Sequence, residues 1–266
     1  MSVVARQGIK YSIIGYLGFL LGTFSAIFIF PYDMEFYGKL RYILPTAEMI
    51  VPIVVFGLSF SNVKFFSKVN ADGKHHNIFL AISVDFGIIV GIYFLLAYIF
   101  PSLKEFKIWE MKKMILPLAL VLALSSVFNK FLTNYKRVVI PNIFENFVPK
   151  IANLGAFCLF FFMGFAEKSA YGFFFMMFVI SLLGYGFYTN KLEKIKPDFD
   201  LAYFKKDNFY KQIFTYSLFG FLGNIGSYVA IKIDSIMIGE FISFQENGIY
   251  NNIYSIISLI VVPQMG

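Results

Sequence analysis

The chain contains seven apolar runs that are each long enough to cross a lipid bilayer. The first, residues 11–30, has twenty residues without a charge and lies between Lys10 and Pro31. A helix needs about 20 apolar residues to cross the hydrocarbon core, whereas a signal peptide has a shorter core of roughly 7–15 residues. The other runs cover residues 42–60, 78–100, 114–132, 148–165, 171–188 and 213–238, and an eighth begins at Ile249. Because they lack the alternation of barrel strands, these runs predict an all-α polytopic membrane protein.

Composition excludes several other classes. The sequence is 58% hydrophobic and only 15% charged, against about 25% charged in soluble domains. A single cysteine, Cys158, excludes a disulfide scaffold. The two histidines, His75 and His76, are adjacent and have no cysteine or paired acid beside them, so no metal site is predicted. The sequence has no GxxxxGK phosphate motif and no histidine within a run, so we predict no cofactor, no catalytic residue and no enzyme activity. A glycosyltransferase that uses carboxylates is harder to dismiss.

Lysine and arginine are distributed unequally between the two sets of loops. Fifteen of the 23 lie in the N-terminal tail and in every second connection after it, including the basic segment 191–212. Seven lie on the other side, among them a cluster at residues 104–113. Because basic loops stay in the cytoplasm, the N-terminus is predicted to be cytoplasmic. Attraction of these lysines to anionic lipid accounts for most of the net charge of +7, so nucleic acid is not predicted as a partner.

An internal repeat links the two ends of the chain. Residues 11–18 read YSIIGYLG and residues 216–223 read YSLFGFLG, with five identities in eight at an offset of 205. Residues 36–38 before the second run are echoed by residues 246–248 before the eighth. The second copy begins six runs after the first, which is an even number of membrane crossings. Both copies therefore start from the same side, and the repeat is parallel. Parallel repeats build transporters with two lobes and a substrate site between them.

Three motifs in this order resemble those of a known transporter family. They are GIKYSIIGYLGFLLGTFSAIFIFPY followed by FYG, IPNIFENFVPKI, and KIDSIMIGEF followed by NGIY. The sequence is similar to the polysaccharide flippases, which export O-antigen and capsule repeat units, of the multidrug/oligosaccharidyl-lipid/polysaccharide exporter superfamily. The resemblance covers the whole chain and implies flipping of an undecaprenyl-diphosphate-linked oligosaccharide to the periplasmic leaflet of a bacterial inner membrane, as in lipopolysaccharide biosynthesis.

The resemblance also implies a domain organisation. Members are similar to the MATE exporters in having two six-helix lobes. Residues 1–190 are then the N-terminal six-helix lobe, residues 191–212 a basic cytoplasmic linker, and residues 213–266 the first one to two helices of a truncated C-terminal lobe. On this interpretation Gly266 interrupts the second helix of that lobe.

Charges in or near the runs are the candidates for cavity residues, because a diphosphate and a sugar must cross about 30 Å of hydrocarbon. They are Glu48, Asp85, Lys130, Lys150, Lys232 and Asp234. Glu48 lies three residues after Pro45 and four before Pro52, so the three share one helix face. Prolines free carbonyls that protein or cavity water must satisfy, so this face is predicted to bend and to line a cavity. Glu48 is either a titratable carboxylate that couples transport to protons or an acid bonded within the bundle.

The remaining charges have two interpretations each. Asp85 is either a structural hydrogen-bonding group or an ion-coupling one. Lys232 and Asp234 are two residues apart and point about 160° from each other on a helix, so one of them is expected to face the cleft. Lys232 alternatively extends to the outer interface.

Lys130 and Lys150 surround the connection after the fourth run together with Lys136 and Arg137. A diphosphate arriving from the inner leaflet would meet these cations there. Attraction to anionic headgroups is the alternative explanation for them.

Three functions stay open at this point. The first is the lipid-linked oligosaccharide flippase, with H⁺ or Na⁺ as coupling ion and a polysaccharide polymerase and assembly proteins as partners. The second is a proton- or sodium-coupled drug exporter of the same superfamily, against which the basic loops argue. The third is an inactive or accessory membrane fragment.

Overall fold

The computed structural model describes residues 3–72, 77–194, 203 and 208–261; within these ranges the side chains of residues 3–7, 70, 77–86, 88 and 259–261 are not described. The described residues form helices and no strand, which confirms the all-α class. The elements are α1 (Val3–Phe28), η1 (Phe30–Tyr32), α2 (Met34–Val55), α3 (Leu58–Ala71), α4 (Asn77–Ile99), η2 (Pro101–Glu105), α5 (Lys107–Glu110), α6 (Lys112–Asn134), α7 (Val139–Asn142), the π-helical η3 (Ile143–Phe147), α8 (Val148–Phe157), the π-helical η4 (Cys158–Phe162), α9 (Glu167–Leu192), α11 (Phe209–Phe241) and α12 (Phe244–Val261).

The described helices make this a multi-pass membrane protein. By length and composition five spans can cross a membrane, or six if the bent pair α2 and α3 is one span. The five are α6, α9, α11, the segment Gly8–Tyr32 that contains most of α1, and the continuous segment Val139–Phe162 formed by α7, η3, α8 and η4. Helix α4 adds the apolar segment Ile89–Ile99. The division of the chain at residues 190 and 213 stays a prediction, because most of the linker between them lies outside the described residues.

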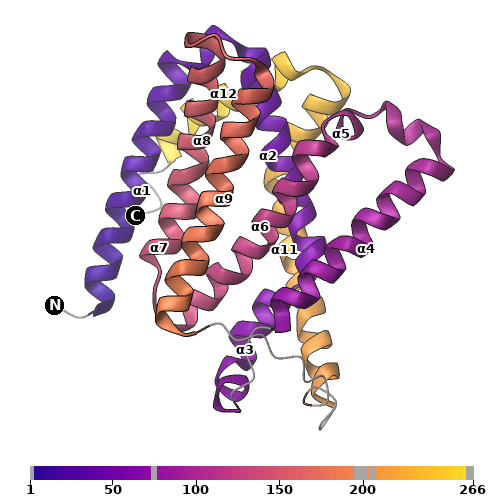
Figure 1. Cartoon of the computed structure of the whole chain (residues 1–266). Helices are drawn as coiled ribbons and strands as arrows, with labels where there is room; N and C mark the ends of the chain where they lie inside the picture. Colours follow the sequence, from indigo (N-terminus) through magenta and orange to yellow (C-terminus); the bar gives the residue numbers. More distant parts are fainter. Residues whose placement is uncertain (1–2, 73–76, 195–202, 204–207, 262–266) are drawn as a thin grey trace.

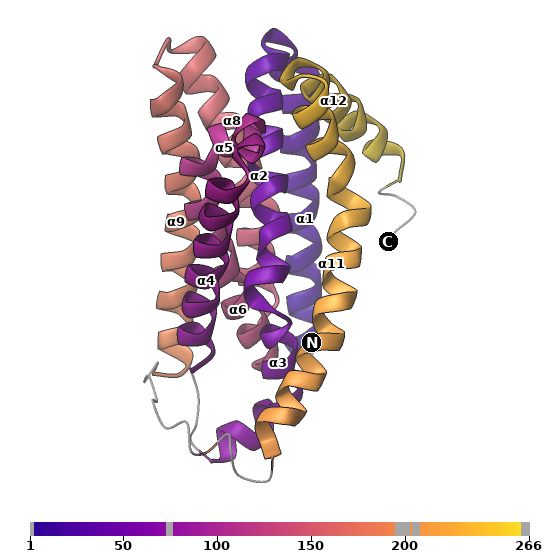
Figure 2. The ribbon, with the colours of Figure 1, turned by 90° about the vertical axis from the view of Figure 1, so that its right-hand side faces the viewer.

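The helices stand side by side and alternate in direction. Figure 1 shows α1, α8 and α9 as neighbouring upright rods, while α4 diverges from α6. Both views place α3 and the beginning of α11 at one end of the molecule, and η1 and α5 at the other (Figures 1 and 2). This alternation is the arrangement that successive spans of a polytopic protein require.

Helix α2 lies at the centre of the bundle, where it packs against α6, α11 and α12. It carries fully buried aromatic side chains such as Tyr42, and it begins at Asp33, whose carboxylate accepts the Phe36 N–H at 2.9 Å. Its two prolines, Pro45 and Pro52, lie within the continuous helix. The bend of 45° to α3 comes later, at residues 56–57, where both backbone φ angles are positive. The break therefore follows the second proline by one helical turn instead of coinciding with either proline.

Helices α2 and α12 cross with their backbones in contact. A Cβ on Gly38 would lie 1.7 Å from the Phe244 carbonyl oxygen, and a Cβ on Gly248 would lie 2.0 Å from the Met34 carbonyl oxygen. Gly38 therefore faces Phe244, which is four residues before Gly248, and Gly248 faces Met34, which is four residues before Gly38. The contact is reciprocal, as at a twofold axis. These are the two glycines that the repeat pairs in the sequence, and only glycine permits this approach.

Candidate functional site

Two charged cavities lie at different heights along α2 and are built from different partners. The smaller, which we call the cationic cavity, has a volume of about 110 Å³ and lies between α1, η1, α2, α8 and α12. Its lining residues are Phe19, Gly22, Thr23, Ser25, Phe30, Tyr37, Arg41, Lys150, Asn153 and Ser255. It contains two cations and several hydroxyl or amide groups, and none of its lining residues is acidic.

The helix packing explains how Lys150 reaches this cavity. Its Nζ lies 3.5 Å from the position of a Cβ on Gly18, and its aliphatic stem lies 3.4 Å from that on Gly22. Two glycines four residues apart form a shallow groove on α1, and the lysine stem fills it. Among the residues that the structure describes, no carboxylate lies within ion-pair distance of Lys150 or Arg41. Cations held inside a helix bundle without a counter-ion favour an anionic ligand.

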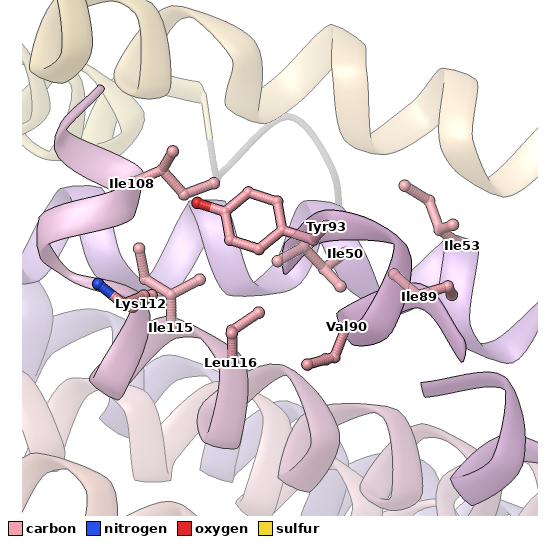
Figure 3. A pocket seen from close by; sticks show the side chains of 9 residues that line it. All are labelled: Ile50, Ile53, Ile89, Val90, Tyr93, Ile108, Lys112, Ile115 and Leu116. Atoms are coloured by element: carbon pink, nitrogen blue, oxygen red, sulfur yellow. The ribbon is translucent and has the colours of Figure 1, made fainter. Parts of the chain in front are cut away.

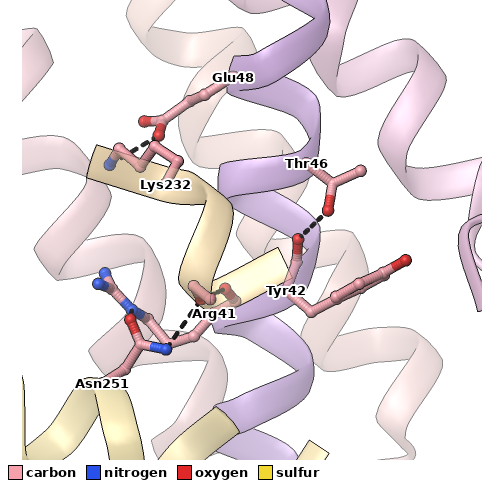
Figure 4. A network of polar contacts seen from close by, with 7 residues as sticks. Arg41, Tyr42, Thr46, Glu48, Lys232 and Asn251 are labelled. Carbon is pink, nitrogen blue, oxygen red and sulfur yellow. Dashed lines mark hydrogen bonds and ion pairs between the residues drawn. The ribbon is translucent and has the colours of Figure 1, made fainter. Parts of the chain in front are cut away.

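A closed polar network fixes Arg41 between α2, α11 and α12 (Figure 4). Its Nε donates to Asn251 Oδ1 at 2.9 Å, and the Asn251 amide donates to Ser235 Oγ at 2.9 Å. The Ser235 hydroxyl is 2.8 Å from the Arg41 carbonyl oxygen. That carbonyl lacks its helical donor because the residue four positions later is Pro45, which has no N–H. Asn247, which is fully buried, donates to the Gly38 carbonyl at 2.9 Å and completes the network.

The larger cavity, which we call the acidic cavity, has a volume of about 310 Å³. It lies between α2, α6, η3, α8, α9 and α11, and α12 takes no part in it. Its lining residues are Glu48, Val51, Leu122, Ser125, Ser126, Phe144, Glu145, Pro149, Phe178, Ser181, Tyr185 and Tyr228. It therefore combines two carboxylates, hydroxyl groups and four aromatic rings.

Glu48 connects the acidic cavity to α11 through an ion pair. Lys232 Nζ lies 2.8 Å from Glu48 Oε2, and both side chains are mostly buried, with exposed fractions of 28% and 22% (Figure 4). The contact is ionic in character, since Glu48 Oε2 makes no hydrogen bond to any described residue. Lys232 is thus held within the bundle and does not extend to the outer interface.

Glu145 is the second carboxylate of the acidic cavity, and its side chain is exposed. It accepts a hydrogen bond from the amide of Asn129 on α6. The charges of Lys130 and Glu48 both act on it through space. Lys130 Nζ itself lies 5.1 Å above the Phe60 ring, a cation–π contact, and lines neither cavity.

The other predicted residues lie apart from the two cavities. Asp234, two residues after Lys232, points to α12 and accepts the Tyr250 hydroxyl at 3.1 Å. The two residues therefore face different partners, as their spacing predicts. Asp85 is within α4, but its side chain lies outside the described residues, as do His75 and His76. In the part of the chain that is described, no group of three or more His, Cys, Asp or Glu side chains could hold a metal ion.

A third pocket is apolar. It has a volume of about 140 Å³, lies between α2, α4, α5 and α6, and is drawn in Figure 3. Its lining residues are Ile50, Ile53, Ile89, Val90, Tyr93, Ile108, Lys112, Ile115 and Leu116. Branched aliphatic side chains dominate it, and its only polar side chains are those of Tyr93 and Lys112. The Lys112 ammonium already donates to the Trp109 carbonyl at 2.9 Å, so the pocket offers a phosphate or a sugar few polar groups.

Sequence reasoning missed two of the four charged residues of the cavities, Arg41 and Glu145. The predicted runs begin at residues 42 and 148, whereas the helical segments begin at Met34 and Val139. Arg41 is therefore counted among the cations of the outer loops and Glu145 is left outside the runs, although both lie inside helical segments. The capping residue Asp33 and the acidic first turn after it are the signals that mark the earlier start of α2.

A second group of contacts joins the end of α11 to α2 and α5. Glu240 accepts a hydrogen bond from the Tyr42 hydroxyl and, at 2.6 Å, from the backbone N–H of Lys107. The Lys107 ammonium donates to the Gly239 carbonyl and lies 4.8 Å from the Phe244 ring. At this end the α11–α12 pair is closed tightly against the rest of the molecule.

Comparison with known proteins agrees with this architecture. A family model described as polysaccharide biosynthesis protein matches residues 8–263. The chain belongs to the polysaccharide biosynthesis protein family. Neither the curated proteins nor the solved structures give a significant match. Membership agrees with the resemblance seen in the motifs and associates this membrane protein with polysaccharide biosynthesis.

Proposed function

We propose that this member of the polysaccharide biosynthesis protein family is a flippase. Its substrate is an oligosaccharide linked to undecaprenyl diphosphate, which it moves across the bacterial inner membrane by alternating access. The N-terminus is cytoplasmic in this proposal, and a gradient of H⁺ or Na⁺ drives the cycle. The exported unit passes to a polysaccharide polymerase and its assembly proteins.

The observation that carries the proposal is the pair of cations in the cationic cavity. Arg41 and Lys150 face one small cavity inside the spans without a carboxylate partner among the described residues. A diphosphate supplies the missing negative charge, and the guanidinium of Arg41 can hold phosphate oxygens in a forked geometry. The cavity lies where α1, α2 and α8 meet α12, so movement of α12 would open it.

Family membership separates this proposal from a drug exporter of the same superfamily. The acidic cavity alone suits an organic cation, because carboxylates and aromatic rings attract positive charge. The family, however, is described by polysaccharide biosynthesis. A chain that exported ethidium from vesicles and moved no glycolipid would favour the drug exporter.

Flipping in proteoliposomes tests the proposal directly. The purified protein is reconstituted with undecaprenyl diphosphate-linked N-acetylglucosamine that carries a fluorescent label, and label accessible from outside is bleached by dithionite. We expect Lys150→Met to lower the flipping rate at least about tenfold, because a charged phosphate contact is worth roughly 1.5–3 kcal/mol. The matched control is Lys168→Met, since Lys168 is exposed at the start of α9 and lines neither cavity.

Two outcomes would contradict the proposal. One is a Lys150→Met variant that flips the labelled lipid as fast as the parent protein. The other is equal movement of labelled phosphatidylethanolamine, which has no diphosphate. Comparable melting temperatures of the two lysine variants show that any loss arises at the cavity and not from unfolding.

A further inference from the structure

The acidic cavity has the dimensions of a site for one small polar molecule. Its volume of about 310 Å³ lies at the lower end of the roughly 300–1,000 Å³ typical of small-molecule sites. The cationic cavity, at about 110 Å³, is too small for more than an anionic group. If the cationic cavity holds the diphosphate, the acidic cavity is the place beside it that can hold a sugar ring.

The walls of the acidic cavity provide the apolar half of sugar recognition. Phe144, Phe178, Tyr185 and Tyr228 come from η3, α9 and α11 and surround it with aromatic rings. The carbon-bound hydrogens of a sugar ring form apolar faces that pack on such rings, while its hydroxyls point outward. A sugar therefore suits walls of this kind better than an inorganic ion does.

The polar groups of the cavity are mainly hydrogen-bond acceptors. The hydroxyls of Ser125 and Ser126 donate their single protons to the carbonyls of residues 121 and 123, each at 2.7 Å, which leaves their lone pairs free to accept. Ionised Glu48 and Glu145 can only accept. The Tyr185 hydroxyl points to the Pro141 carbonyl at 3.4 Å.

The cations near the cavity do not reverse this balance. Lys232 is paired with Glu48, and Lys130 lies over the Phe60 ring. Neither of these lysines lines the cavity. The hydroxyls of Ser181 and Tyr228 can donate, but two carboxylates and two serine oxygens accept, so the cavity favours a ligand rich in hydrogen-bond donors.

We propose that the acidic cavity binds a neutral or amino sugar and selects against sugars that carry a carboxylate, such as uronic acids. Hydroxyl and ammonium donors form charge-assisted hydrogen bonds with Glu145, whereas a uronate adds a like charge and supplies fewer donors. This inference rests on the proposed function, because the bound sugar is the group attached to the diphosphate. It adds the chemical class of that sugar.

Saturation-transfer NMR with soluble glycosides tests the cavity separately from transport. The probes are methyl glucoside, methyl glucosaminide and methyl glucuronide, added to the purified protein at neutral pH. We expect the neutral and amino glycosides to give signals at least fivefold stronger than the glucuronide. Glu145→Gln should reduce this preference to twofold or less, because the amide supplies donors and removes the charge.

The matched control is Glu105→Gln, which removes an exposed carboxylate in η2 far along the chain from the cavity. It should leave the fivefold preference unchanged. Equal or stronger saturation of the glucuronide by the parent protein would overturn the inference, as would an unchanged preference in Glu145→Gln.

The failures of the two proposals are distinguishable. A protein that selects the neutral glycoside but flips no diphosphate-linked lipid contradicts the flippase and supports the sugar site. A protein that flips the lipid and prefers the glucuronide supports the flippase and overturns the sugar site.

Discussion

The two charged cavities differ in sign, in size and in the helices that enclose them. The cationic cavity, of about 110 Å³, uses α1 and α12, whereas the acidic cavity, of about 310 Å³, uses α6, α9 and α11. Helices α2 and α8 serve both. Arg41 and Glu48 are seven residues apart on α2, or about 10 Å along the axis at 1.5 Å per residue.

The contrast shows how one pair of helices can present two chemistries. Adjacent residues of α8, Pro149 and Lys150, line different cavities. A small site with unpaired cations suits an anion, and a larger site with acceptors and rings suits a sugar. A substrate that joins a diphosphate to a sugar needs both kinds of site within one molecular length.

The largest effect that separates the cavities is expected from Arg41→Met. Loss of the guanidinium removes the proposed phosphate contact and the bond to Asn251, which together should cost about 3 kcal/mol, or about a hundredfold in flipping rate. The rate should fall equally for undecaprenyl diphosphate with and without a sugar. The flipping rate of Arg41→Lys should lie between those of the parent protein and Arg41→Met, because lysine keeps the positive charge and loses the forked geometry of the guanidinium. A loss confined to the glycosylated lipid would show that Arg41 serves the sugar instead.

The next effect concerns α12, which lines the cationic cavity and not the acidic one. Gly38→Ala places a Cβ 1.7 Å from the Phe244 carbonyl oxygen, and the forced separation of α2 from α12 should cost about 2–3 kcal/mol. The control is Gly223→Ala on α11, where no described atom lies within 4 Å of the new Cβ. Melting temperatures in detergent compare the two. A Gly38→Ala protein that melts like the parent would mean that α2 and α12 do not need to touch.

Sequence reasoning found the class of fold and two of the four charged cavity residues, Glu48 and Lys150, but not their partners. The uncharged core of each span is visible to hydropathy, so the apolar runs correspond to helices. The same criterion begins these two runs at residues 42 and 148, so it leaves Arg41 and Glu145 just outside them. The pairing of Glu48 with Lys232 depends on how α2 packs on α11, and no local pattern specifies that contact.

Glycine spacing carried more long-range information than charge did. The repeat aligned residues 36–38 with 246–248, and the structure brings Gly38 and Gly248 into contact at the α2–α12 crossing. Residues close to the pseudo-twofold axis between two repeats contact the equivalent residues of the other repeat. A repeat in the sequence therefore predicts the contacts at that axis. Away from the axis that argument gives no partner, which is why Lys150 could not be placed beside Gly18 and Gly22 in advance.

A smaller effect is expected from the ion pair that ties the acidic cavity to α11. Glu48→Lys and Lys232→Glu should each destabilise the protein, and the double exchange should recover about 1 kcal/mol by restoring the pair in reverse. The comparison pair is Glu35 and Lys39 on α2, also close at 3.2 Å but with Glu35 63% exposed. Because Lys39 also lies 3.2 Å from Glu167, this exchange is made in a Glu167→Gln background, where it should recover only about 0.3–0.5 kcal/mol. Chemical or thermal unfolding gives both values. Equal recovery at the two sites would mean that the bundle does not shield Glu48 from water.

The smallest effect tests how Arg41 is held. Ser235→Ala removes the hydroxyl next to the Arg41 carbonyl that Pro45 leaves without a helical donor, and this should cost about 1 kcal/mol. In a Pro45→Ala background the backbone N–H of residue 45 can bond that carbonyl, so the same serine change should cost about half as much. A double-mutant cycle on unfolding free energies measures the difference. Strict additivity would show that the serine acts only through its bonds to Asn247 and Asn251. In either case the acidic cavity, which contains neither residue, should keep its preference for neutral glycosides, because the two cavities share helices but no lining side chain.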